Sequence, residues 1–197
     1  MDPRTHILIA NKIYSGLEPM KKSIIKKKNF IYGNVKPDMI SKYKLKKHYR
    51  KESYDIIVNK IEDLAKINDL NDIQNKKFFC NFSQELGVIC HFICDFFCVP
   101  HDESERWEFK HSMVRHIAYE KKLNLISRNY FFKKNIKINL DYSRNIRDFL
   151  DEVYIDYKNN KYLNSYERDL DYSYNICIII ISSIINELLY HYRKTIW

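Results

Sequence analysis

Glycine and proline are scarce in this sequence, with three and four residues among 197. Few residues can therefore interrupt a helix, and no run of either residue suggests a linker. No internal repeat or domain boundary is visible. The sequence predicts an all-α, multi-helix bundle that forms a single domain over residues 1–197, long enough to enclose a real core.

A Cys-x-x-Cys motif is also missing. Three of the five cysteines, Cys90, Cys94 and Cys98, recur at every fourth position of one apolar segment. This spacing puts them on one helix face, which is typical of small packing residues and not of disulfides or a structural zinc site. A metal-ligand role for Cys94 or Cys98 is the remaining alternative.

The N-terminal segment lacks the apolar run of a signal peptide. We therefore expect a cytoplasmic protein, with export by another route left open. The run Ile176–Ile185 is very apolar, but it is short and is followed by Asn186 and Glu187. It predicts a buried core helix, so we expect no transmembrane segment.

Positive charge is concentrated in Lys21–Lys51, which holds twelve Lys or Arg residues against one acid, Asp38. A field of this sign attracts phosphates, so an anionic membrane surface or nucleic acid is a candidate for peripheral contact. The alternative is a solvated, lysine-rich face. Because Gly33 and Pro37 interrupt this stretch, it is predicted to be a loop with short helical pieces.

Apolar periodicity predicts most of the remaining chain to be helical. The predicted helices are 5–14, with Thr5 as the N-cap, then 52–67, 78–99, 107–127, 144–157 and 164–192. Polar composition predicts loops at 68–75, after His101 and at 129–143, the last with a small extended piece at 136–140.

Two potential metal ligands interrupt the apolar segment 86–97. His91 and Asp95 are four residues apart, so they share one helix face. Pro100 then ends the helix, and His101 follows where it can turn back toward that face. Burying an imidazole and a carboxylate among apolar side chains is costly unless a partner satisfies both. A divalent metal would do so.

His116 and Glu120 form a second pair with the same spacing. The further candidates are His6, Asp38 and His48. Imidazole and carboxylate ligands without thiolate suit hydrolytic zinc, with manganese or iron as lesser options. Each candidate also has a structural alternative: a helix-start residue, a turn former, a surface residue or a hydrogen-bonded pair. Two histidines are set aside, His111 because it lacks an acid four residues later and His191 because no partner is visible.

These residues lie in five sequence pieces, in the order Thr5-His6-Ile-Leu-Ile-Ala, Gly33-x3-Pro37-Asp38, His48, Leu86-Gly87-x3-His91-x3-Asp95-x4-Pro100-His101 and His116-x3-Glu120. In this order, over most of the chain, they resemble the zinc-dependent phospholipase C family, which is similar in fold to the S1/P1-type nucleases. The resemblance implies an all-helical fold of the phospholipase C/P1 nuclease type with a zinc cluster at the bottom of a cleft.

The resemblance also implies ligand sets for two or three zinc ions. The first ion would be held by Asp38, His48, His91 and Asp95, and the second by His101, His116 and Glu120. Asp95 would bridge to a third ion, which takes His6. The secreted enzymes complete that third site with the free amine of an N-terminal tryptophan. This sequence has no such tryptophan, which leaves the Met1 amine, Asp2 or water.

The activity implied is phosphodiester hydrolysis by metal-activated water, with Asp38 as the base or as the residue that orients the water. A phospholipid would give a diacylglycerol and a phosphorylated head group. One alternative is a nuclease or nucleotidase, in which Lys21–Lys51 would hold the polyanion and Phe97 or Trp107 would stack a base. The other is a non-catalytic, metal-stabilised binding protein.

Overall fold

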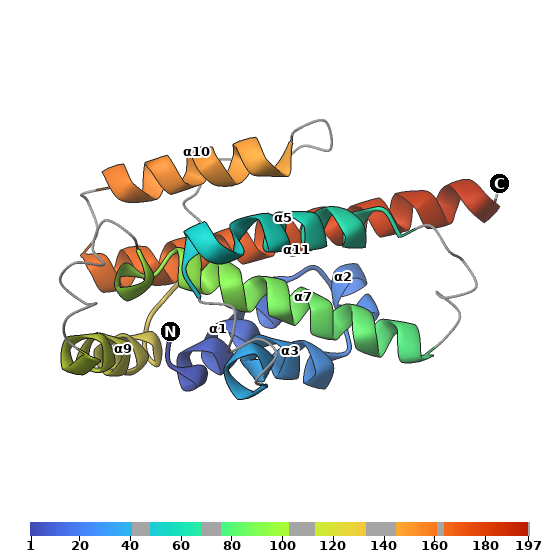
Figure 1. Cartoon of the computed structure of the whole chain (residues 1–197). Helices are drawn as coiled ribbons and strands as arrows, with labels where there is room; N and C mark the ends of the chain where they lie inside the picture. The colour runs from blue at the N-terminus through green and yellow to red at the C-terminus, as the bar shows by residue number, and fades with distance from the viewer. Residues whose placement is uncertain (41–47, 68–75, 103–112, 133–144, 161–163, 197) are drawn as a thin grey trace.

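The computed structural model describes residues 1–40, 48–67, 76–102, 113–132, 145–160 and 164–196. Of these, residues 192–196 are described as backbone only. The described residues form helices and contain no strand, which confirms the all-α class. The helices, shown in Figure 1, are α1 (Pro3–Gly16), α2 (Pro19–Ile24), α3 (Lys27–Met39), α5 (Arg50–Ala65), α7 (Lys76–Phe96), the 3-10 turn η1 (Val99–His101), α9 (Met113–Ser127), α10 (Ile146–Asn159) and α11 (Ser165–Ile196).

Helix α7 is the central element of the fold. Figure 1 shows it between α1 and α3 on one side and α5 and α11 on the other, with α10 outside α5 and α11. Every residue from Leu86 to Asp102 is buried. A helix that is apolar on all sides can satisfy its surface only inside the core, and the composition of this segment explains its place. The core therefore surrounds the His91–Asp95 pair.

Helix α3 packs along α7 more extensively than any other pair of described helices. Two glycines permit this approach. A Cβ atom on Gly87 would lie 2.3 Å from the carbonyl oxygen of Phe30, and one on Gly33 would lie 2.2 Å from that of Gln84. The two backbones thus meet where no side chain fits, and this contact places the C-terminal end of α3, with Asp38, beside α7.

The predicted loop within Lys21–Lys51 is wrong for residues 27–39, because α3 runs through Gly33 and Pro37 without a break. Gly33 serves close packing in a helix and not a turn. Pro37 lies in the last turn of α3, where its missing N–H group removes only one helical hydrogen bond. Residues 41–47, which carry four of the lysines of this stretch, lie outside the described residues.

Helix α1 begins two residues before the predicted Thr5 cap. Asp2 is the N-cap, its carboxylate accepts a hydrogen bond from the Arg4 backbone N–H at 2.8 Å, and Pro3 opens the helix. The Thr5 hydroxyl instead accepts a bond from Asn124 at 3.2 Å and so joins α1 to α9. His6 lies on the buried face of α1, in the register that continues with Ile9, Ala10 and Ile13.

The other helix predictions are confirmed with shifted ends. Helices α5, α7 and α10 match their predicted segments to within three residues, and α11 continues four residues beyond the predicted end. The described part of 107–127 is α9, whereas residues 107–112 lie outside the described residues. The predicted loop at 68–75, the predicted loop after His101 beyond residue 102, and the extended piece at 136–140 also lie outside them.

By length and hydropathy, the Ser165–His191 part of α11 could cross a membrane. However, 61% of its most apolar window is buried inside the protein, as expected of a core helix, so it is weak evidence for a membrane span. The helix packs against α7, α1 and α5.

All five cysteines are free thiols. Cys94 of α7 and Cys177 of α11 face each other with 3.9 Å between their sulfur atoms, and burial raises the pKa of both thiols. A buried thiol is mostly protonated and reacts slowly. We therefore expect a thiol reagent to label only the half-buried Cys80 in the native protein and the other four cysteines after unfolding. In native Cys80→Ser protein no thiol should react, and labelling of any remaining cysteine would contradict this packing.

The substitution Gly87→Ala should destabilise the fold, because its new methyl group meets three backbone atoms of α3 within 2.8 Å. Overpacking of this kind costs about 1–3 kcal/mol, which outweighs the better helix propensity of alanine. Gly16→Ala is the matched control, since its nearest neighbour is the hydroxyl of Tyr174, a side-chain end that can move. Urea unfolding measures both, and an equal loss in the two variants would contradict the α3–α7 contact as described.

Candidate metal centre

The last two turns of α7 carry the two residues around which the site is arranged. His91 and Asp95 are both fully buried, and His91 Nε2 lies 3.3 Å from Asp95 Oδ2. His91 Nδ1 lies 2.8 Å from the backbone carbonyl oxygen of Asn34 on α3. Because a carbonyl only accepts hydrogen bonds, Nδ1 must carry the proton. The nitrogen with a lone pair available to a metal is therefore Nε2, the atom that faces Asp95.

His6 enters the site from α1. Its ring stacks on that of His91 with 4.0 Å between centroids, and its Nε2 lies 3.3 Å from Asp95 Oδ1. Burial, followed by the charge of His91, lowers the pKa of His6 to about 3. Both ring nitrogens of His6 are buried without a hydrogen-bond partner. Buried polar atoms are rarely left unpaired, so this neutral imidazole has the features of a metal ligand.

Asp38 and His48 close the site from a third side. His48 Nδ1 donates to Asp95 Oδ2 at 2.8 Å and lies 3.7 Å from Asp38 Oδ1. Burial alone would lower the pKa of His48, but the hydrogen bond and charge of Asp95 outweigh this effect and raise the pKa above its ordinary value. Burial raises the pKa of Asp38, whose second oxygen, Oδ2, is buried without a hydrogen-bond partner.

A second group lies next to the first. His101 of η1 and His116 of α9 both approach Glu120 Oε1, at 3.2 and 3.0 Å. Burial alone would raise the pKa of Glu120, but the Met1 amino group and the two histidines hold it well below its ordinary range. Burial, aided by the Met1 charge, lowers the pKa of His101. The groups are joined through Asp95, whose Oδ1 lies 3.9 Å from His101 Nε2.

The amino group of Met1 lies between the two groups. It donates to Asp95 Oδ1 and lies 3.1 Å from His101 Nε2 and 3.2 Å from Glu120 Oε1. Burial alone would raise the pKa of Asp95, but the charge of this amine, then those of His101 and His91, holds it well below its usual range. Among the three alternatives for the third site, the amine is in place. The Asp2 carboxylate instead caps α1 and pairs with Arg4.

All eight residues predicted as ligands therefore converge. Ligand atoms lie within 4.8 Å of one another in three sets: His6, Asp38 and His91; His48, His91 and Asp95; His101, His116 and Glu120. Two of the carboxylates, Asp95 and Glu120, face the Met1 amino group, and burial lowers the pKa values of the His6 and His101 imidazoles. This set of nitrogen and oxygen donors around a buried carboxylate fits a divalent ion such as zinc.

The cysteine alternative finds no support in the described residues. No set of ligand atoms there that could hold a metal includes Cys94 or Cys98. The two histidines set aside in the sequence analysis are His191 and His111. His191 lies 3.8 Å from Glu187, a partner one helical turn earlier, and His111 lies outside the described residues.

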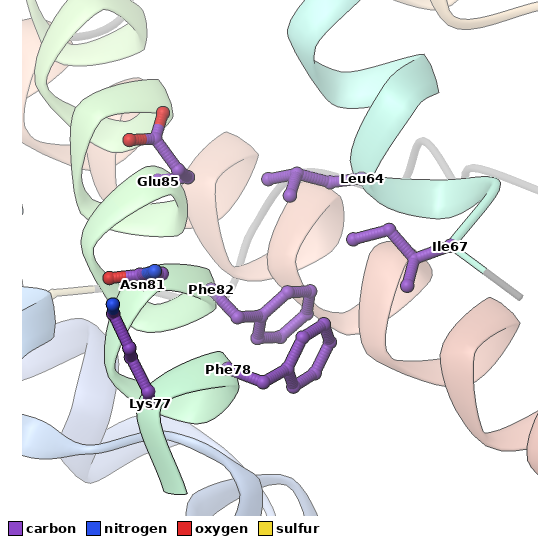
Figure 2. A pocket seen from close by; sticks show the side chains of 7 residues that line it. All are labelled: Leu64, Ile67, Lys77, Phe78, Asn81, Phe82 and Glu85. Atoms are coloured by element: carbon purple, nitrogen blue, oxygen red, sulfur yellow. The ribbon is translucent and has the colours of Figure 1, made fainter. Parts of the chain in front are cut away.

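A cavity of about 260 Å³ lies elsewhere, between the end of α5 and the first turns of α7. Figure 2 shows Phe78 and Phe82 side by side in it, opposite Leu64 and Ile67. None of the eight candidate ligands lines this cavity. It is close in sequence to residues 68–75, which lie outside the described residues.

A family model described as zinc dependent phospholipase C matches residues 5–173, a span that contains all eight candidate ligands. The chain belongs to the zinc-dependent phospholipase C family. No curated protein and no solved structure matches it. The zinc dependence of the family agrees with the donor atoms gathered here.

Within this chain, sequence reasoning missed the groups that act through the backbone. The Asn34 carbonyl that orients His91 leaves no side-chain signal. Gly87 could have indicated a close helix contact but was noted only as part of a motif. The proposed base-stacking role of Phe97 is wrong, because this ring is 1% exposed and packs against Tyr157 and Tyr172. Trp107 lies outside the described residues.

Zinc should stabilise the native protein, because the ligand atoms come together only in the fold. At a free zinc concentration 100 times the dissociation constant, one site contributes about 2.7 kcal/mol. We expect a chelator to lower the midpoint of thermal unfolding and zinc to restore it. Asp95→Asn should remove most of this response, whereas the exposed Asp148→Asn on α10 should retain it. A zinc response that survives in Asp95→Asn would contradict the central place of Asp95.

Proposed function

We propose that this protein is a zinc-dependent phosphodiester hydrolase that cleaves phospholipids into a diacylglycerol and a phosphorylated head group. The observation that carries this proposal is the clustering of eight zinc-type ligands, buried Asp95 among them, in a member of the zinc-dependent phospholipase C family. These ligands come from α1, α3, α7, η1 and α9, and His48 comes from the segment just before α5.

The contacts support two principal metal positions and a third. Asp38, His48, His91 and Asp95 would hold one ion, and His101, His116 and Glu120 a second. His6 would hold a third together with Asp95 Oδ1, which the Met1 amino group also contacts. Asp95 can serve two of these positions because its two oxygens face different partners, Oδ2 toward His48 and Oδ1 toward His6 and Met1.

Bound zinc would supply Lewis-acid activation of a water molecule and of the phosphoryl oxygens. The chain supplies the orientation. Asp38 Oδ1 points toward His48 and His91, both 3.7 Å away, whereas Oδ2 has no protein partner. We assign to Oδ2 the task of accepting the proton of the attacking water and holding that water in line with the phosphorus.

The exposure of the site residues indicates where substrate enters. His6, His91 and Asp95 have no exposed side-chain surface, whereas Asp38 and His116 are each 22% exposed. His48 and Glu120 are each 17% exposed. A phosphodiester group could therefore reach the metal positions from the side of Asp38, His48, His116 and Glu120 while the other ligands stay enclosed.

The test compares hydrolysis of a short-chain phosphatidylcholine with hydrolysis of single-stranded DNA, each with and without chelator. We expect chelator-sensitive release of the phosphorylated head group. His91→Ala should lose both bound zinc and activity, while His191→Ala, outside the cluster, keeps both. Asp38→Asn should retain the second zinc position and lose roughly 10²- to 10⁴-fold in kcat.

Three results would contradict the proposal. Faster cleavage of DNA would favour the nuclease alternative. Zinc binding without turnover of either substrate would favour a metal-stabilised binding protein. Full activity in His91→Ala protein that holds no zinc would remove the metal from the reaction altogether.

A further inference from the structure

A second buried carboxylate, Asp169 of α11, lies outside the candidate ligand set. It is fully buried and accepts three hydrogen bonds. Its Oδ2 accepts from the Val99 backbone N–H and the Tyr119 hydroxyl, both at 2.9 Å, and its Oδ1 accepts from the Tyr157 hydroxyl at 2.7 Å. Such a carboxylate is tolerated in a core only with partners of this kind, so its position is strongly determined by them.

Two of the three donors are neighbours of candidate metal ligands. Val99 opens η1, the turn that ends at His101, and Tyr119 directly precedes Glu120 on α9. One oxygen atom of Asp169 therefore holds both segments that supply the group His101, His116 and Glu120. The third donor, Tyr157, lies on α10 and joins this arrangement to the outer helix.

The turn η1 depends on such anchors because it is only three residues long. Short 3-10 turns have few hydrogen bonds of their own, and here the His101 N–H bonds to the Cys98 carbonyl at 2.8 Å. The residue after His101, Asp102, is 2% exposed and accepts from Lys158 Nζ at 2.8 Å. The turn is thus held before His101 by Asp169 and after it by Lys158.

We propose that Asp169 is a positioning residue for the metal group His101, His116 and Glu120: it fixes η1 relative to α9, so that the three ligand atoms meet before an ion binds. The inference rests on the proposed metal role of that group. Removing Asp169 would leave the Val99 N–H and two phenol hydroxyls without their acceptor, and η1 could shift away from α9. The ligands on α3 and α7 would stay in place.

The test is a titration of metal-free protein with zinc in competition with a chromophoric chelator, which separates ions by affinity. Asp169→Ala should lower the affinity for one zinc ion by roughly 10- to 100-fold, the range found when residues that hydrogen-bond to metal ligands are removed. The remaining ions should keep their affinity. Asp169→Asn should restore most of the loss, because its amide oxygen can still accept from Val99 and Tyr119.

Two tyrosine variants keep the test independent of whether Asp169→Ala folds. Tyr119→Phe removes the hydrogen bond between α9 and Asp169 and should lower the affinity for the same zinc ion. Tyr172→Phe is the matched control, since its hydroxyl joins α11 to Asp156 and Asn160 on and beside α10 and does not contact η1 or α9. It should lower stability without changing any zinc affinity.

The outcomes separate this inference from the proposed function. Equal loss of affinity at all ions, or lower stability with unchanged affinities in the Asp169 and Tyr119 variants, would overturn the positioning role. Glu120→Gln tests the group itself: if that variant binds as many ions as the wild type, with equal affinity, the ligand assignment fails. The role of Asp169 toward that group then fails with it, whereas a loss in Glu120→Gln but not in Asp169→Ala overturns the positioning role alone.

Discussion

The carboxylate of Asp95 has no contact with solvent, and the remainder of the site is arranged to satisfy its two oxygens. Transfer of an unpaired carboxylate into an apolar core is prohibitive, so partners must be supplied by the fold. They come from distant segments: the Met1 amino group and His6 on Oδ1, and His48 and His91 on Oδ2. The Oδ1 contacts require the start of α1 to lie against α7, and the His48 contact requires the segment before α5 to reach α7. Figure 1 shows α1 and α3 together on one side of α7.

The site also depends on the close approach of α3 to α7. Gly33 and Gly87 let the two backbones touch, which brings the Asn34 carbonyl to His91 and Asp38 to the edge of the cluster. On the opposite side, Asp169 connects η1 and α9. The site is thus held by the packing of α3 on α7 and by the bonds of Asp169 to η1 and α9. Asp38, His48, His116 and Glu120 remain partly exposed.

The sequence predicts much of this site because metal ligands must be side chains of a few types at helical spacing. The pairs His91–Asp95 and His116–Glu120 follow from a period of about 3.6 residues alone. The apolar surroundings of α7 likewise predict its central position. The relation between the pairs does not follow from spacing, since it depends on backbone groups such as the Asn34 carbonyl and on contacts between segments far apart in the chain.

The errors have the same origin. Gly33 and Pro37 predict a break by their local preferences, but tertiary packing keeps α3 continuous through both. Phe97 looks like a residue available to a ligand by proximity to His101 in the sequence, yet it faces the aromatic core formed with Tyr157 and Tyr172. Asp169 lies in a tyrosine-rich helix start with no motif around it, and only the fold shows that it reaches Val99 and Tyr119.

The most direct measurement of the central claim is anomalous diffraction at the zinc absorption edge from crystals of the zinc-loaded protein. The account predicts one peak among Asp38, His48, His91 and Asp95 and another among His101, His116 and Glu120, with metal–ligand distances of about 2.0–2.3 Å. Zinc peaks only at other places, with His91 and Asp95 bonded to protein groups alone, would contradict it.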